Sequence, residues 1–257
     1  MKHLVRSSFL LLLVVCLSLI AAGRSLAGSS SPGLYPDLRT VVPTHLQLVN
    51  QQQRTILRFS NGIANTGAGP WRLRPENQGG VTYAIQEILD ANGAIAQEHV
   101  ASTFEFHPAH NHWHIGDVAL FEIHAGSPTG PIAGSNSIKV TFCLIDWYRL
   151  EGNAPTSQRT YWDCATSYQG ISPGWVDQYH HSLPGQDLDL TGVAPGRYYL
   201  VSTANPAKTF LETDLNNNTA WVSFDLTYDN TGNAKITLVD HSACATPGLC
   251  GENAPNR

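Results

Sequence analysis

The clearest strand pattern in the chain lies at residues 137–144, which read Ser137-Ile138-Lys139-Val140-Thr141-Phe142-Cys143-Leu144. Large apolar residues occupy every second position, and successive side chains of a strand point to opposite faces of a sheet. The pattern therefore predicts a β-strand with one apolar face. Ile138, Val140 and Phe142 fall on that face, and Lys139, Thr141 and Cys143 fall on the other.

Similar short segments, rich in β-branched and aromatic residues, recur along the chain between Gly, Pro and Asn turn signals. They are Thr55–Asn61, Trp71–Arg74, Val81–Leu89, Ser102–His107, Trp113–His124, Asp187–Leu190, Arg197–Ala204, Ala220–Tyr228 and Lys235–Val239. Beyond residue 27 no stretch of a dozen residues shows helical periodicity, and residues 147–182 are expected to form a long irregular excursion. The sequence predicts an all-β fold, a single β-sandwich-like domain with long irregular loops and very little helix.

The first 27 residues have the features of a secretory signal peptide. Lys2 and Arg6 precede an apolar run over residues 9–22, and Ser25-Leu26-Ala27 supplies small residues at the cleavage positions. We expect cleavage after Ala27, which gives a secreted, extracellular or periplasmic domain of residues 28–257 with no membrane segment. An uncleaved membrane anchor is the alternative.

The charge and the cysteine content agree with export. The chain carries 15 basic against 20 acidic residues and no basic stretch, which argues against a nucleic-acid partner. Beyond residue 27 it has four cysteines, an even number that permits three disulfide pairings. Cys244 and Cys250 enclose a short Pro-Gly loop, so we expect a local bridge there and a second bridge between Cys143 and Cys164.

The densest chemical signal is His110-Asn111-His112-Trp113-His114. Three imidazoles at alternate positions share one face of a strand, and imidazole suits copper, zinc or nickel better than magnesium or calcium. In a fully extended strand the outer two Cα atoms would lie about 13 Å apart, so a shared ion requires a bend or bulge. His107 is a candidate for orienting these ligands. The alternative is that one or two of these histidines are ordinary core or surface residues.

Downstream of the histidines, several segments follow in a distinctive order. They are Lys139-Val140-Thr141-Phe142-Cys143-Leu144, Gln169-Gly170-Ile171-Ser172-Pro173-Gly174-Trp175-Val176-Asp177-Gln178-Tyr179, Val193-Ala194-Pro195-Gly196-Arg197-Tyr198-Tyr199-Leu200 and Glu212-Thr213-Asp214-Leu215-Asn216-Asn217-Asn218. Read after the His-x-His-x-His strand, this order resembles the catalytic domain of the lysyl oxidase family. The resemblance runs from about Pro36 to about Tyr228, so it covers most of residues 28–257.

The resemblance implies a copper-dependent oxidase of primary amines. By motif, His110, His112 and His114 match the copper(II) ligands, and Lys139 and Tyr179 match the pair that forms the lysine tyrosylquinone cofactor. The implied reaction converts a primary amine to an aldehyde, with O₂ as acceptor and release of ammonia and hydrogen peroxide. Lysine side chains of extracellular proteins are one class of such amines.

Elementary chemistry supports these roles. Copper can activate O₂ and oxidise a nearby phenol, whereas zinc is redox-inert. Lys139 must react as the neutral amine, and burial beside a metal lowers the pKa of a lysine. The alternatives are an edge-strand charge for Lys139 and an ordinary packed aromatic for Tyr179. Asp117 matches an acidic family position and is a candidate either for the general base or for an orienting residue.

A second ion, calcium, is expected at Glu212-x-Asp214-x-x-Asn217-Asn218, which supplies the carboxylate and amide oxygens that calcium prefers. The resemblance adds Asp37 and the backbone carbonyl of Leu38 to this site. The alternative is an Asx-rich hairpin turn that binds no ion.

Two other classes of function fit part of the pattern. A His₃ zinc hydrolase would use the histidines but would leave Lys139 and Tyr179 without a role. A noncatalytic, calcium-stabilised extracellular β-sandwich would leave both of these residues and the histidines without a role.

Overall fold

The computed structural model describes residues 32–108, 111–152, 154–164 and 168–256, and for residues 134–140 it describes the backbone alone. Within these residues the chain forms fourteen strands and one short 3₁₀ helix. The strands are β1 Leu38–Gln51, β2 Arg54–Asn65, β3 Trp71–Gln78, β4 Val81–Leu89, β5 Ile95–His107, β6 His112–Ala125, β7 Ile132–Phe142, β8 Tyr148–Arg149, β9 Gln169–Ile171, β10 Trp175–Tyr179, β11 Asp187–Asp189, β12 Gly196–Ala204, β13 Thr219–Tyr228 and β14 Ala234–His241; the helix is η1 Pro247–Cys250. The predicted all-β class is confirmed.

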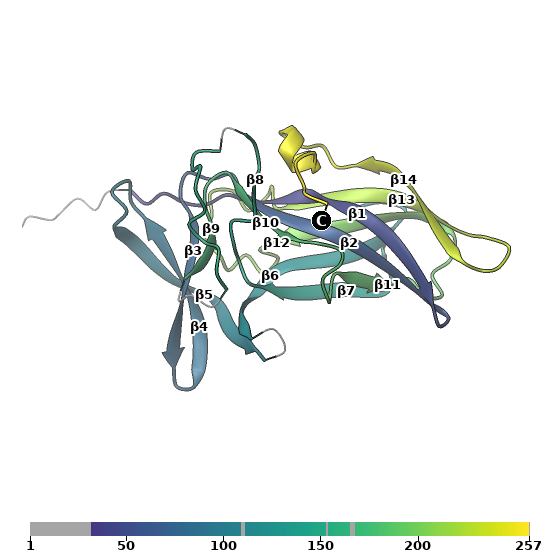
Figure 1. Ribbon diagram of the computed structural model, residues 1–257, viewed down its shortest axis with the longest axis horizontal. Helices are drawn as coiled ribbons and strands as arrows, with labels where there is room; N and C mark the ends of the chain where they lie inside the picture. The colour runs from purple at the N-terminus through teal and green to yellow at the C-terminus, as the bar shows by residue number, and fades with distance from the viewer. Residues whose placement is uncertain (1–31, 109–110, 153, 165–167, 257) are drawn as a thin grey trace, which may run out of the picture. The chain divides into compact units, whose positions relative to one another are not determined.

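The strands are arranged in two open sheets (Figure 1). One has the order β1-β2-β10-β8, with β11 also paired to β2. The other has the order β14-β13-β12-β6-β5-β4-β3-β9, with β7 also paired to β6. Their apolar faces share one core, in which the rings of Phe59 on β2 and Phe121 on β6 meet edge to face with centroids 4.9 Å apart. This is the predicted β-sandwich-like arrangement.

Strand β1 was not among the predicted strands, although it is one of the longest in the fold. Its sequence contains Pro43, and a proline within a run argues against a central strand because it has no N–H to donate. The structure places β1 at the edge of its sheet, with register shifts between Val41 and Thr44 and between Thr44 and Gln47. The proline lies at the first irregularity, so the edge strand tolerates it.

The predicted irregular excursion over residues 147–182 is wrong in part. Strands β8, β9 and β10 all lie within it, and β10 pairs with β2 and β8 inside the smaller sheet. The sequence signal was weak because these strands are only two, three and five residues long. Tyr179 is consequently the last residue of a sheet strand rather than part of a loop.

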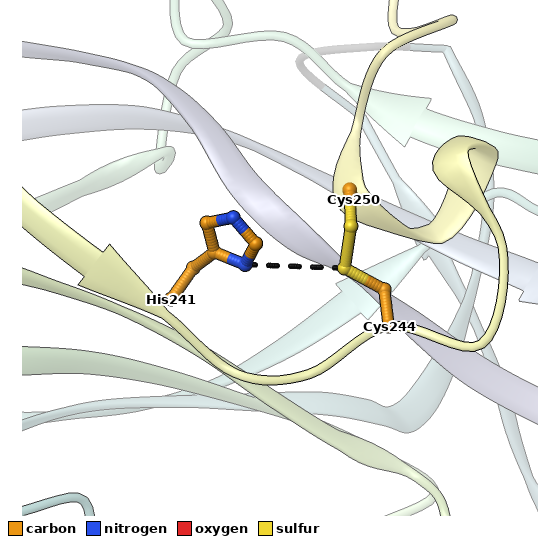
Figure 2. Close-up of side chains that lie close together, drawn as sticks. All are labelled: His241, Cys244 and Cys250. Carbon is orange, nitrogen blue, oxygen red and sulfur yellow. Dashed lines mark hydrogen bonds between the residues drawn. A yellow bond between two sulfur atoms is a disulfide. The ribbon is translucent and has the colours of Figure 1, made fainter.

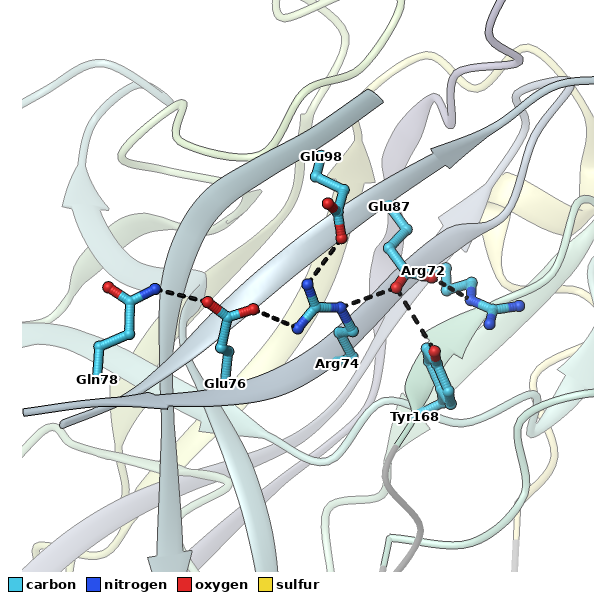
Figure 3. A network of polar contacts seen from close by, with 7 residues as sticks. All are labelled: Arg72, Arg74, Glu76, Gln78, Glu87, Glu98 and Tyr168. Atoms are coloured by element: carbon cyan, nitrogen blue, oxygen red, sulfur yellow. Dashed lines mark hydrogen bonds and ion pairs between the residues drawn. The ribbon is translucent and has the colours of Figure 1, made fainter. Parts of the chain in front are cut away.

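A network of charged side chains ties β3, β4 and β5 together (Figure 3). Glu87 on β4 is 1% exposed and pairs with Arg72 at 2.8 Å and Arg74 at 2.9 Å, both on β3. Arg74 also pairs with Glu98 on β5 at 2.7 Å, and the guanidinium of Arg72 lies 4.0 Å from the ring centre of Tyr168. Because Glu87 is buried, the two arginines replace part of the hydration that its carboxylate loses.

Both expected disulfides are present, Cys143–Cys164 and Cys244–Cys250. Among the described residues, no helix is long and apolar enough to cross a membrane. The predicted signal peptide lies outside the described residues.

Candidate active site

The two described histidines of the His-x-His-x-His motif lie at the start of β6 and face each other. The Nε2 atoms of His112 and His114 are 2.9 Å apart, and their ring centroids are 4.8 Å apart. Asn111, immediately before the strand, has a left-handed φ of 54°, so the expected bend of the chain occurs there. The third predicted ligand, His110, lies outside the described residues.

His114 is oriented by contacts on two sides. Its Nδ1 atom shares a hydrogen bond of 3.1 Å with the hydroxyl of Thr141 on β7, which leaves Nε2 to face His112. The ring of His107, at the end of β5, stacks on the ring of His114 with centroids 5.1 Å apart. Contacts of this kind fix the tautomer and ring orientation of metal-binding histidines.

Beside this pair lies a cavity of about 400 Å³. Its walls come from β6, from the end of β10 and from the segments that follow β7 and β10. The lining residues are His112, His114, Cys143, Ile145, Trp147, Cys164, Asp177, Gln178, Tyr179, Leu183 and Pro184. The cavity therefore brings two of the predicted metal ligands and the predicted cofactor tyrosine to one site.

Neighbouring residues hold both the hydroxyl and the ring of Tyr179. The hydroxyl donates to the carbonyl of Cys143 at 3.0 Å and accepts from the amide of the same residue at 2.7 Å. The ring stacks on Phe142, with centroids 3.7 Å apart. Burial raises the pKa of the phenol well above its usual value of 10.0, the charge of Asp177 adds to the rise, and the Cys143 hydrogen bond opposes it.

Lys139 lies on β7, where its backbone pairs with Leu120 of β6; its side chain lies outside the described atoms. Phe142, which stacks on Tyr179, is three residues further along the same strand, a distance of about 10 Å in extended backbone. The fold thus brings the strand that carries Lys139 to the ring of Tyr179, although the two residues are 40 positions apart in the sequence.

Asp117, the predicted general base or orienting residue, also lies on β6 but is not one of the residues that line the cavity. It has a left-handed φ of 54° and sits where the pairing of β6 with β7 changes register, between Ile115 and Ala119. This β-bulge interrupts the alternation of β6 between His114 and Asp117, so the side chain of Asp117 need not point to the side that the alternation predicts.

Asp177 also lines the cavity, and no sequence pattern predicts a role for it. It is 3% exposed, and its Oδ2 atom has no hydrogen-bond partner among the described residues. Burial raises the pKa of the Asp177 carboxyl well above its usual range, the nearby charge of Asp146 adds to the rise, and a hydrogen bond from the backbone of Ile145 opposes it. The only sequence signal is its place two residues before Tyr179 in the segment Ser172–Tyr179.

Five of the six residues predicted to bind calcium form a connected cluster. Glu212 accepts hydrogen bonds from the amide of Leu38 at 2.8 Å and from the side chain of Asn218 at 2.7 Å, and the side chain of Asn217 donates to Asp37 at 3.0 Å. Burial raises the pKa of Glu212, against the lowering effect of its hydrogen bonds.

Two buried oxygen atoms in this cluster suit a cation. Oδ1 of Asn217 and Oδ1 of Asn218 have no hydrogen-bond partner among the described residues. The sixth predicted residue, Asp214, is exposed, and its carboxylate accepts a hydrogen bond from the amide of Asn216 at 2.9 Å.

A separate group of metal-ligand types, His241, Cys244 and Cys250, lies at the C-terminal end of the described chain (Figure 2). Cys244 and Cys250 are joined in a disulfide, so they have no thiolates to offer. In the part of the chain that the structure describes, no other group of three or more His, Cys, Asp or Glu ligand atoms lies within 4.8 Å of one another.

The sequence model of the lysyl oxidase family matches residues 85–238, which is more than half of the chain. The chain belongs to the lysyl oxidase family. The matched segment contains both described histidines of the motif, Lys139, Tyr179 and the segment from Glu212 to Asn218, and it ends inside β14.

Individual lysyl oxidases match shorter stretches. Bovine lysyl oxidase homolog 1 is 33% identical over 136 residues, 52% of this chain and 22% of the relative. Human lysyl oxidase homolog 3 is 30% identical over 64% of this chain and 18% of its own length, and porcine protein-lysine 6-oxidase is 29% identical over 45% and 44%. The aligned part of this lysyl oxidase family member therefore spans less than half of these relatives.

Among solved structures, an ApaA protein from Bordetella pertussis aligns with 84% of the chain at 10% identity and a TM-score of 0.27. A likeness of this size carries no argument about the fold or the function of this lysyl oxidase family member.

Proposed function

We propose that this chain is a secreted, copper-dependent amine oxidase whose quinone cofactor forms from Lys139 and Tyr179. The observation that carries the proposal is the cavity of about 400 Å³, in which a close histidine pair and Tyr179 lie together. Membership of the lysyl oxidase family supports amine oxidation in general terms. The proposal assigns residues 28–257 to the catalytic domain and residues 1–27 to a cleaved signal peptide.

The described histidines suit a copper ion. Two imidazole nitrogens 2.9 Å apart can both bind one ion, because metal–nitrogen bonds are about 2 Å long. Thr141 and His107 restrict the orientation of His114, which favours a formed site over one that must assemble. We assign copper(II) to His112 and His114, with His110 as the third ligand.

Bound copper would supply oxidation of the phenol by O₂, and the quinone made from that ring would supply the electron sink for amine oxidation. The chain's own contribution to this site is positional. Cys143 fixes the hydroxyl of Tyr179 through two backbone hydrogen bonds, and Phe142 covers one face of its ring. In the strand alternation, Lys139 is predicted to share a face with Thr141, the residue that contacts His114.

The proposed reaction takes a primary amine and O₂ and yields an aldehyde, ammonia and hydrogen peroxide. The lysine side chains of extracellular proteins are one substrate class of this kind, and the porcine relative is named for oxidation of protein lysine. Asp117 stays a candidate for orienting the histidine strand rather than for contact with substrate, because it does not line the cavity.

We further propose that calcium joins Asp37 and the carbonyl of Leu38 to Glu212, Asp214, Asn217 and Asn218. Support comes from the two unpartnered amide oxygens of Asn217 and Asn218 and from the cluster of carboxylates around them. Oxygen ligands in a partly flexible arrangement suit calcium. The site is structural in this account, because it connects the first strand to the segment before β13.

One experiment separates the proposed function from its two rivals. The full chain is expressed, loaded with copper, and analysed for bound metal, for quinone by redox staining, and for peroxide release from n-butylamine. Copper with quinone and peroxide supports the proposal. Zinc without quinone favours the hydrolase, and calcium alone favours the noncatalytic module.

The matched control is a pair of lysine variants. Lys139→Arg keeps a positive charge but stays protonated and cannot add to a quinone, so we expect copper without quinone. Lys235→Arg changes an exposed lysine beside Asp229 and should keep both copper and quinone.

A further inference from the structure

We propose that Asp177 binds the ammonium group of the substrate amine in the cavity beside Tyr179. This inference rests on the proposed function in one respect only, that the substrate is a primary amine. It assigns to a specific residue the recognition of the substrate's charged end, a role that neither Asp117 nor the histidines fill.

Asp177 is placed to meet a ligand beside Tyr179. It is the third residue of β10, between β2 and β8 in the sheet, and its backbone pairs with Ile63. Among the described residues that line the cavity, it is the only one with a carboxyl group. Tyr179 is two residues later on the same strand, so the two side chains share one face of β10.

One oxygen of the Asp177 carboxylate lacks a hydrogen-bond donor in the described part of the chain. Asp177 is 3% exposed and Oδ2 has no donor among the described residues, and an unpaired buried carboxylate is strongly disfavoured. A buried carboxylate oxygen without a donor indicates a ligand that brings hydrogen-bond donors, and an ammonium group carries three.

The charges around the cavity favour a cationic ligand. The described side chains that line the cavity include no lysine or arginine; the side chain of Lys139 lies outside the described atoms. The nearby carboxylate, Asp146, already accepts hydrogen bonds from Ser172 and from the amides of Thr160 and Tyr161, so it is satisfied by the protein. A cationic ligand would compensate Asp177, and the aliphatic part of such a ligand would meet Ile145, Leu183 and Pro184 on the cavity wall.

The contact also prepares the amine for reaction. An ammonium nitrogen has no free electron pair. When one N–H bond breaks and the proton passes to Oδ2 of Asp177, the electron pair of that bond stays on nitrogen, and the neutral amine becomes a nucleophile. Atoms and charge balance within the pair, and the step needs no oxidant. A buried carboxyl with a raised pKa is a suitable acceptor for this proton.

The test is a binding measurement that needs neither copper nor quinone. n-Butylammonium and n-butanol, which have the same alkyl chain, are titrated calorimetrically into the full chain purified without added copper. We expect the wild type to bind the ammonium at least tenfold more tightly than the alcohol. An equal affinity for the two probes in the wild type would overturn the proposal without recourse to any variant.

The variant comparison uses Asp177→Asn, which is nearly isosteric, and Asp189→Asn as its control, because Asp189 is a surface carboxylate paired with Arg54 at 2.8 Å. Asp177→Asn should lose the preference for the cation while it retains the weak binding of butanol, which reports an intact cavity. Asp189→Asn should behave as the wild type. A cation preference that survives in Asp177→Asn would refute the assignment.

Failure of this inference is distinguishable from failure of the proposed function. If the wild type shows the cation preference but copper-loaded protein makes no quinone and no peroxide, the oxidase proposal fails and the ammonium site stands. If the oxidase is active but the cation preference is absent or independent of Asp177, the ammonium site fails alone.

Discussion

At the scale of single residues, the site depends on the pair His112 and His114. Their Nε2 atoms lie 2.9 Å apart, and His114 is turned toward His112 by its hydrogen bond to Thr141. His112→Ala should therefore lower copper affinity by more than the roughly 10- to 100-fold that loss of an outer contact costs, because a ligand itself is removed. Copper per chain, measured by mass spectrometry of the metal, checks this.

The control for that substitution is His241→Ala, an exposed histidine that contacts the Cys244–Cys250 disulfide. It should leave the copper content at the wild-type level. Stoichiometric copper in His112→Ala would remove this residue from the proposed metal site.

A second residue-scale prediction concerns His45, which packs near His180 and His181 with ring centroids 5.6 and 6.0 Å away. Burial lowers the pKa of His45 below 6.5, and the charges of His180 and His181 lower it further. Near and below pH 6.5, His45 therefore binds more protons in the unfolded chain than in the folded protein. The free energy of unfolding consequently decreases as the pH falls from 6.5 toward the lowered pKa of His45. The melting temperature should drop between pH 7.5 and pH 5.5.

His45→Asn should reduce that slope, because asparagine does not titrate and tolerates the left-handed φ of 53° at this position. Thermal melts of both proteins across this pH range decide the matter. Equal slopes would show that His45 is not a source of the acid sensitivity.

The histidine motif could be predicted from the sequence because alternation along one strand is a local pattern. Asp177 could not be assigned in the same way. Its burial depends on β10 lying between β2 and β8, and its pKa depends on Asp146, which is 31 positions earlier in the chain. The residues next to Asp177 in the sequence show neither that it is buried nor that Asp146 lies near it.

At the scale of elements, the Cys143–Cys164 disulfide joins the end of β7 to the segment before β9 and forms part of the cavity wall. It spans 21 residues, against 6 for Cys244–Cys250. In the chain-entropy model, loss of the longer bridge should cost about 3 kcal/mol and loss of the shorter one about 2 kcal/mol.

The double variants Cys143→Ala/Cys164→Ala and Cys244→Ala/Cys250→Ala test this by urea denaturation. We also expect the first variant to impair quinone formation, because the backbone of Cys143 holds the hydroxyl of Tyr179, whereas the second variant should not. A larger loss of stability in the second variant would contradict the account.

Most predicted strands match the structure because they are rich in β-branched and aromatic residues, several alternate cleanly, and turn residues flank them. The exceptions have identifiable causes. Pro43 concealed the edge strand β1, and β8 to β10 are too short for a pattern to show. As a result, the sequence indicated the sandwich but not that Tyr179 belongs to one of its sheets.

At the scale of the whole domain, the cluster of Asp37, Glu212, Asn217 and Asn218 joins its first strand to the segment before β13. If calcium binds there, it stabilises the folded state by an amount that grows with the logarithm of its concentration above the dissociation constant. Added calcium should raise the melting temperature, and a chelator should lower it.

Glu212→Gln should abolish the calcium-dependent part of that shift, whereas Glu105→Gln, which alters an exposed residue of β5, should preserve it. Differential scanning calorimetry with and without calcium gives the answer. If calcium does not change the melting temperature of the wild type, a hairpin turn without an ion is favoured.

The claim on which the whole account depends is that Lys139 and Tyr179 become covalently joined. The fold brings β7 to the ring of Tyr179 through Phe142, with its ring centroid 3.7 Å from that of Tyr179. Peptide mapping by mass spectrometry of copper-loaded protein tests the claim most directly. The account predicts one linked peptide containing both residues, present in wild type and Lys235→Arg and absent in Lys139→Arg. Separate, unmodified Lys139 and Tyr179 peptides from a preparation that oxidises primary amines at full rate would contradict it.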